Sequence, residues 1–191
     1  MSTKTIILAS GSLWRRRLLK KHGVVFKVVV SNFKERKTHE TPRMVAIHNA
    51  CGKAESVLKK HPHATVIGID TVGVLRGKVF GKPKNRAHAR RMLLSISGTV
   101  HRVISGMCVL DGQSGVRIVT AVTTKVHFKK LDEQELERYL DSGQWKGKAG
   151  AYAIQGRAKG FVKKIDGALS NVVGIPIPQL LSILKKLHIA K

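Results

Sequence analysis

The residue with the clearest chemical signature is Asp70, the single carboxylate in the apolar run Val66-Ile-Gly-Ile-Asp-Thr71. A carboxylate in such a run is costly to bury unless a cation or hydrogen bonds compensate it. Gly68 and Gly73 allow a ligand or another backbone to come close. We therefore interpret Asp70 as a metal ligand or general base, with Thr71 shaping the site or touching the substrate. The alternative is a strand-end aspartate that bonds backbone amides.

Acidic residues are scarce, which makes elimination useful. The chain has 11 Asp and Glu residues against 36 Lys and Arg. Glu35 and Asp70 have no evident structural role. The other nine have expected structural places. One polar helix carries Asp132, Glu133, Glu135, Glu137 and Asp141, and a second helix has Glu40 and Glu55 in or beside it. The remaining two, Asp111 and Asp166, precede a glycine, as turn residues often do.

Two basic segments have features of anion sites. Lys82 lies in Phe80-Gly-Lys-Pro83, where glycine frees the approach and proline keeps the preceding residue extended. The segment Ser10-Gly-Ser12 is a predicted strand-to-helix turn, followed by Arg15, Arg16 and Arg17. Hydroxyls, amides and guanidiniums at a helix N-terminus bind anions. A surface lysine and an ordinary serine cap are the alternatives.

Two further positions are ambiguous from sequence alone. Lys53 follows Gly52 inside a predicted helix, where glycine costs roughly 1 kcal/mol and indicates close packing. A solvated lysine is the simpler interpretation. Gln155, in a glycine-rich segment, carries an amide that can read a base edge, or it is a satisfied core glutamine.

The composition limits the class of protein. The formal net charge is +25, which attracts polyanions, although the cations are scattered and locate no groove. Cys51 and Cys108 form no disulfide framework, no zinc-type histidine spacing occurs, and no apolar run reaches the length of a membrane span. We expect a cytoplasmic protein that does not span a membrane.

Periodicity and capping residues predict alternating strands and helices followed by a long hairpin, hence an α/β protein with a mixed sheet. The predicted strands are Lys4 to Ala9, Val24 to Val30, Thr65 to Val74, Lys78 to Phe80, Val100 to Leu110, Val116 to Phe128 and Phe161 to Ile165. The predicted helices are Leu13 to Lys21, Pro42 to about Lys60, one capped by Asn85, one from Asp132 to about Leu140, and Pro178 to Leu187.

Several motifs in order resemble the Maf family of nucleotide pyrophosphatases from about Ile6 to Leu187. They are Leu8-Ala-Ser-Gly-Ser12 with Arg15, Lys53-Ala54, Val66 to Val72, Gly81-Lys-Pro83, Leu94 to Gly98 with His101, Lys148 to Gly156, and Ser170 to Pro176. The resemblance implies a single domain over residues 1–191, with a mixed twisted sheet, flanking helices and two lobes around a cleft, as in the inosine-triphosphate pyrophosphatases.

The resemblance also implies the chemistry. Family members hydrolyse nucleoside triphosphates between the α and β phosphates with a divalent cation, Mg²⁺ or Mn²⁺. Asp70 matches the proton acceptor, and Glu35 matches an acid near the metal. Thr71 and Gln155 match positions linked to base choice, in the form seen in members that act on dTTP and UTP.

One position departs from the family pattern, which usually reads Ser-Pro-Arg-Arg where this chain has Ser12-Leu-Trp-Arg15. Trp14 stands in place of an arginine tied to substrate recognition. Either its ring stacks on a base, or Arg15 or Arg16 compensates for the lost guanidinium.

These inferences give two hypotheses. The first is a metal-dependent pyrophosphatase acting on dTTP, UTP or modified nucleotides, with Asp70 catalytic and Asp70 and Glu35 holding the metal. Phosphates would be bound by Ser10, Ser12, Arg15, Lys53 and Lys82, and base choice would depend on Trp14, Thr71 and Gln155. The alternative is a basic protein that binds nucleotides or nucleic acid non-specifically with weak or no turnover. A homodimer is left open in either case.

Overall fold

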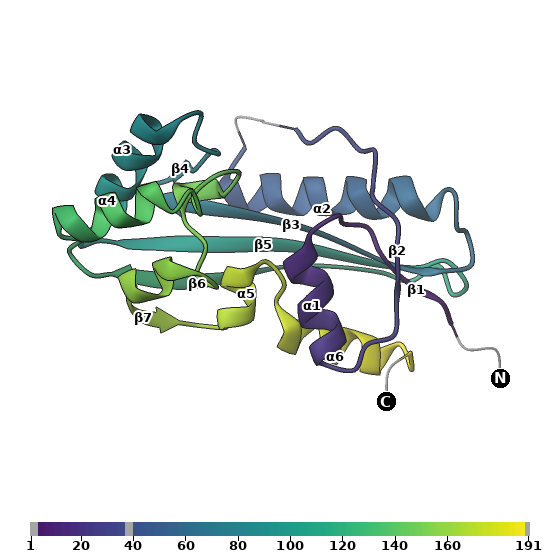
Figure 1. Cartoon of the computed structure of the whole chain (residues 1–191). Coiled ribbons are helices and arrows are strands. Elements are labelled where there is room, and N and C mark those ends of the chain that lie inside the picture. The colour runs from purple at the N-terminus through teal and green to yellow at the C-terminus, as the bar shows by residue number, and fades with distance from the viewer. Residues whose placement is uncertain (1–3, 37–39, 190–191) are drawn as a thin grey trace. The chain divides into compact units, whose positions relative to one another are not determined.

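The computed structural model describes residues 4–36 and 40–189. Its centre is a seven-stranded sheet in the order β2-β1-β3-β5-β6-β7, with β4 paired to β3 (Figure 1). Strand β1 is parallel to β2 and β3, whereas β4 is antiparallel to β3 and β7 to β6. The strands are β1 Ile6–Leu8, β2 Lys27–Val28, β3 Thr65–Leu75, β4 Lys78–Val79, β5 Val100–Asp111, β6 Arg117–Phe128 and β7 Val162–Asp166. The predicted mixed α/β fold and long hairpin are confirmed.

Six α-helices and two short 3₁₀ helices accompany the sheet in the described part of the chain. They are α1 Leu13–Lys21, α2 Pro42–Leu58, α3 Arg86–Ile96, α4 Glu133–Asp141, α5 Leu169–Val173, α6 Ile177–Lys186, η1 Ala149–Ala151 and η2 Arg157–Phe161. Four helices, α1 to α4, begin with a side chain that accepts a hydrogen bond from the backbone N–H three residues later: Ser12, Thr41, Asn85 and Asp132. Capping of orphan N–H groups explains why these starts were predictable.

The chain forms two compact units. The first comprises Met1–Thr71, Ser105–Val122 and Gly174–Lys191, and the second comprises Val72–Ile104 and Thr123–Val173. Each has its own apolar core. The single domain with a cleft between two lobes stays a prediction.

Two apolar layers sandwich the sheet of the first unit. Ile67 and Ile69 of β3 pack with α1 and α6, while Val66 packs with α2 on the other side (Figure 1). The alternation follows from the period of two along a strand. Gly68 faces α2, where a Cβ would lie 2.1 Å from the carbonyl oxygen of Ala50. Helix α2 therefore lies unusually close to β3.

In the second unit, α3 and α4 pack over an aromatic core that includes Phe128, Tyr139 and Phe161. Arg86 pairs with Glu137 and Asp141, and Arg90 pairs with Glu133 and Glu137. The acidic residues of α4 therefore form ion pairs with α3, which gives them a structural role and separates them from Glu35 and Asp70.

Three details differ from the predictions. Of the predicted strand Val24 to Val30, only Lys27–Val28 forms a strand beside β1, and Val24 instead packs in the first unit's core. Helix α5 was not predicted. Asp111 is buried at 1% exposure and accepts hydrogen bonds from Lys4 and Ser114, so it is more than a turn residue.

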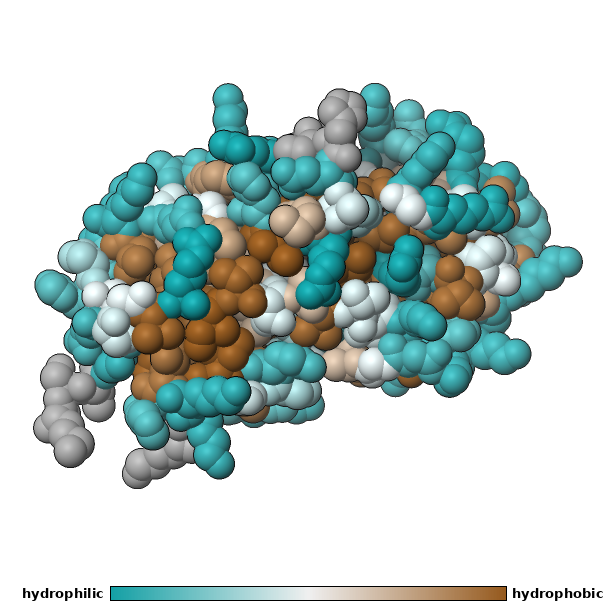
Figure 2. Space-filling view, turned by 180° about the vertical axis from the view of Figure 1, so that it is seen from behind, coloured by the Kyte–Doolittle hydropathy of each residue, from teal (hydrophilic) through white to brown (hydrophobic). Residues whose placement is uncertain are grey.

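The molecular surface is mixed. Hydrophilic side chains surround a gathering of apolar residues on the face shown in Figure 2. Cys51 and Cys108 are buried and free. None of the described helices is long and apolar enough to cross a membrane.

Candidate active site

Asp70 is buried near the end of the first-unit part of β3, with 7% of its surface exposed. Its Oδ1 accepts a hydrogen bond from Lys53 Nζ at 2.7 Å, and its Oδ2 accepts one from Asn49 Nδ2 at 3.3 Å. Asn49 and Lys53 are four residues apart on α2, so they lie on one face of the helix. The cation and amide supply the compensation that a buried carboxylate requires.

Lys53 also contacts the second acid singled out in the sequence. Its Nζ lies 2.7 Å from Glu35 Oε1, so one ammonium joins both carboxylates. The Lys53 side chain is 13% exposed, whereas the Glu35 side chain is 60% exposed. The simpler interpretation of Lys53, a lysine on a solvated helix face, is therefore wrong.

The segment that carries Glu35 is anchored to α2. The backbone N–H of Arg36 donates to Asn49 Oδ1 at 2.9 Å, and Asn49 Nδ2 donates to the Arg36 carbonyl at 3.4 Å. A Cβ on Gly52 would lie 2.3 Å from the ring of Phe33. Gly52 thus admits an aromatic side chain from the same segment, which confirms the close packing expected there.

Arg15 occupies the centre of a second hydrogen-bond network. Its guanidinium donates to the carbonyls of Gly174 (2.7 Å) and Ile69 (3.1 Å), and to the hydroxyls of Ser10 (3.0 Å) and Thr71 (3.0 Å). Burial lowers the pKa of Arg15, and the charges of Asp70 and Glu35 oppose that shift. The network ties α1, β3 and the chain before α6 together.

The hydroxyls near this network have distinct positions. Ser10 Oγ accepts hydrogen bonds from Arg15 and from the N–H of Ser12. Ser12 caps α1. Thr71 Oγ1 lies 2.8 Å from Ser105 Oγ and donates to the Gly174 carbonyl at 3.2 Å. Thr71 is thus held in one orientation by protein groups.

Trp14 is partly buried on α1, and the guanidinium carbon of Arg17 lies 5.0 Å from the centre of its ring. A cation over an indole face is an attractive arrangement. The departure from the family pattern therefore places an aromatic plane, covered on one side by an arginine, on the helix that carries Arg15.

Lys82 and Gln155 belong to the second unit. Lys82 is exposed, and Gln155 is partly buried in a turn. Their segments meet within that unit, because Gly150 N–H donates to the Gly81 carbonyl at 3.2 Å. The approach of these two side chains to Asp70 stays a prediction.

A buried aromatic group supports these two segments, and no local pattern predicts it. His101 Nε2 lies 2.7 Å from the Tyr152 hydroxyl, and the His101 ring makes edge contacts with Phe80 and Phe128. Burial lowers the pKa of His101 to about 4. His101 is therefore a neutral core residue at neutral pH, beside the segments that carry Lys82 and Gln155.

Sequence reasoning missed Asn49 and Ser105. Asparagine has a low helix propensity because its side chain competes for backbone hydrogen bonds. Asn49 nevertheless lies inside α2 with only 3% of its surface exposed. That local conflict was the available signal for Asn49. Ser105, fully buried on β5, had no comparable signal.

The oxygen donors suit a divalent cation such as Mg²⁺ or Mn²⁺. Asp70 and Glu35 are carboxylates joined by one ammonium, and Mg²⁺ is commonly bound by one or two carboxylates plus phosphates and water. No cluster of three or more metal-ligating side chains occurs among residues 4–36 and 40–189.

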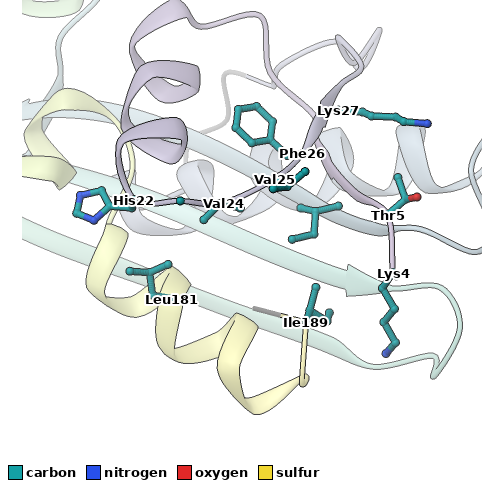
Figure 3. Close-up of a pocket in the computed structure, with 11 residues that line it drawn as sticks. Lys4, Thr5, His22, Val24, Val25, Phe26, Lys27, Leu181 and Ile189 are labelled. Carbon is teal, nitrogen blue, oxygen red and sulfur yellow. The ribbon is translucent and has the colours of Figure 1, made fainter. Parts of the chain in front are cut away.

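A cavity of about 560 Å³ opens elsewhere on the first unit (Figure 3). It is lined by Thr5, Phe26 and Leu181 among others, at the amino end of β1, whereas Ser10 follows the carboxyl end of that strand. No residue predicted to act in the reaction lines this cavity, so the cavity is separate from the candidate active site.

A family model described as Maf-like protein matches residues 5–187. The chain belongs to the Maf family. Its Maf relatives include proteins named dTTP/UTP pyrophosphatase from Pelotomaculum thermopropionicum, 44% identical with 96% of each chain covered, and from Pyrococcus horikoshii, 43% identical with 94% and 95% covered. A third, with the same name, comes from Dictyoglomus thermophilum and is 42% identical with 96% of each chain covered.

Proposed function

We propose that this Maf protein is a nucleoside triphosphate pyrophosphatase that acts on dTTP and UTP. Three relatives at 42–44% identity over nearly the whole chain carry that activity in their names. The observation that carries the proposal is the buried carboxylate of Asp70, held between Lys53 and Asn49. No observation favours the alternative of a binding protein without turnover.

Asp70 acts as the general base in this proposal. It accepts a proton from water while the water oxygen forms a bond to the α-phosphorus, the bond from that phosphorus to the α–β bridging oxygen breaks, and pyrophosphate leaves from the nucleoside monophosphate. A positioned carboxylate contributes about 10²–10⁴-fold to such a step. In the free protein, Asn49 and Lys53 hold this carboxylate in one orientation.

Asp70 and Glu35 would hold the divalent cation, Mg²⁺ or Mn²⁺. A bound divalent cation supplies Lewis-acid polarisation of phosphoryl oxygens. The positive groups of Lys53 and Lys82, with Ser10 and Ser12, would bind the triphosphate and stabilise its charge. Arg15 would also bind the phosphates in this proposal.

Base choice is assigned to Thr71, Gln155 and Trp14. Thr71 is fixed by its bonds to Arg15 and Ser105, and a fixed hydroxyl discriminates bases better than a mobile one. The Trp14 ring, flanked by Arg17, offers a plane for stacking. A cytoplasmic location, a homodimeric state and non-specific binding of nucleic acid through the net charge are further proposals.

The test is replacement of Asp70 with Asn, assayed by pyrophosphate release from dTTP and UTP with Mg²⁺ or Mn²⁺. We expect a loss of at least about 100-fold in kcat with the circular dichroism spectrum retained. Glu55→Gln is a matched control, because Glu55 is an exposed carboxylate on α2 that pairs with Arg117. Turnover by Asp70→Asn at the parent rate would refute the assignment, and no turnover of any nucleotide by the parent would refute the proposed function.

A further inference from the structure

Lys53 occupies the space between the two carboxylates assigned to the metal. Its Nζ is 2.7 Å from Asp70 Oδ1 and 2.7 Å from Glu35 Oε1. The two oxygens are therefore separated by no more than twice that distance. A Mg²⁺ ion bonds oxygen at about 2.1 Å. An ion bonded to both oxygens would therefore compete with the Lys53 ammonium for the same two acceptors.

The charges around these oxygens are already balanced. Lys53 contacts both carboxylates, and the Arg15 guanidinium is close enough for the charges of Asp70 and Glu35 to act on it. Among residues 4–36 and 40–189, these two cationic groups accompany the two anionic ones. The chain as a whole has a net charge of +25, which repels free cations. Lys53 and Arg15 therefore offset the negative charge of Asp70 and Glu35 that would attract a divalent cation.

Movement of Lys53 away from the carboxylates is favoured when another anion receives the ammonium. Lysine has a flexible four-carbon stem, so its ammonium can shift while the Cα stays fixed on α2. In the proposed function, the anion that reaches this site is the substrate triphosphate. Its phosphates would both accept the ammonium and supply metal ligands that the two carboxylates lack.

We propose that Lys53 is an internal counter-ion that blocks divalent-cation binding to Asp70 and Glu35 until a triphosphate receives its ammonium. The metal and the nucleotide then bind as a coupled pair, with little metal bound to the free protein. This inference rests on the proposed function for the identity of the anion, while the competition between ammonium and metal rests on the contacts of Lys53 alone.

The first experiment titrates Mn²⁺ into nucleotide-free protein and measures unbound Mn²⁺ by electron paramagnetic resonance. We expect Lys53→Met to bind one Mn²⁺ at least tenfold more tightly than the parent, because the competing ammonium is gone. Lys60→Met is the matched control: it removes the same charge from an exposed position just after α2. Its affinity should stay within twofold of the parent. Unchanged or weaker Mn²⁺ binding by Lys53→Met overturns the inference.

A second experiment needs no variant, so it holds if Lys53→Met does not fold. The parent protein is titrated with Mn²⁺ alone and with an α,β-imido analogue of dUTP, and the analogue is titrated without protein. We expect the ternary mixture to bind Mn²⁺ at least tenfold more tightly than either component. Equally tight binding by the protein alone overturns the inference. Turnover of dTTP is measured separately, so a failed function and a failed competition give different results.

Discussion

Replacing Arg15 with Met removes the guanidinium and keeps most of the side-chain stem. The change breaks the bonds to Ser10 and Thr71 and leaves the carbonyls of Ile69 and Gly174 without that donor. Hydrogen bonds to a charged group are worth roughly 1.5–3 kcal/mol each, and such values add incompletely. We expect a loss of about 3–5 kcal/mol in the free energy of unfolding.

The assay is urea unfolding together with thermal unfolding followed by circular dichroism. For a chain of this size, each kcal/mol lowers Tm by roughly 2–4 °C, so the expected drop is about 6–20 °C. Lys20→Met is the control, since Lys20 is exposed on the same helix, and it should change stability by less than about 0.5 kcal/mol. A loss below about 1 kcal/mol for Arg15→Met would show that the network contributes little to stability.

Two further predictions concern packing and pH. Gly68→Ala should lower the free energy of unfolding in urea by about 3 kcal/mol, because the new Cβ would lie 2.1 Å from the Ala50 carbonyl oxygen. Gly81→Ala is the control and should be near neutral, since a Cβ there meets nothing within 4 Å. Equal effects of the two changes would contradict this packing argument. The folded-state pKa of His101, about 4, lies below its unfolded value of about 6.5, so its stabilising contribution is complete above pH 6.5 and is lost as pH falls toward 4. Unfolding free energies at pH 7.5 and 4.5 should show a smaller pH dependence in His101→Gln than in the parent, and identical profiles would contradict the assignment.

Much of the fold was predictable because local rules and tertiary packing agree. Each helix start with a polar cap was found, and the long hairpin followed from β-rich runs on either side of a glycine turn. The predicted strand Val24 to Val30 failed for the opposite reason. A valine run satisfies strand propensity, but Val24 contributes to the core by packing, and pairing depends on a neighbour that the sequence does not reveal.

The candidate site was predictable in its acids and less so in its cations. Asp70 stood out because carboxylates are rare and this one lies in an apolar run. Lys53 is 17 positions away and looked like a surface lysine, since only the three-dimensional path of α2 brings it to Asp70. Arg15 was predicted to bind phosphate, yet its donors reach a carbonyl 159 positions away. No local pattern reports such contacts.

The close approach of α2 to β3 at Gly68 has a consequence for how the sequence of this segment can change. An α-helix turns by about 100° per residue, so one residue inserted between Ala50 and Lys53 would point the ammonium away from Asp70. The same insertion would push a different side chain against the flat surface that Gly68 provides. Insertions and deletions should therefore be poorly tolerated within this turn of helix.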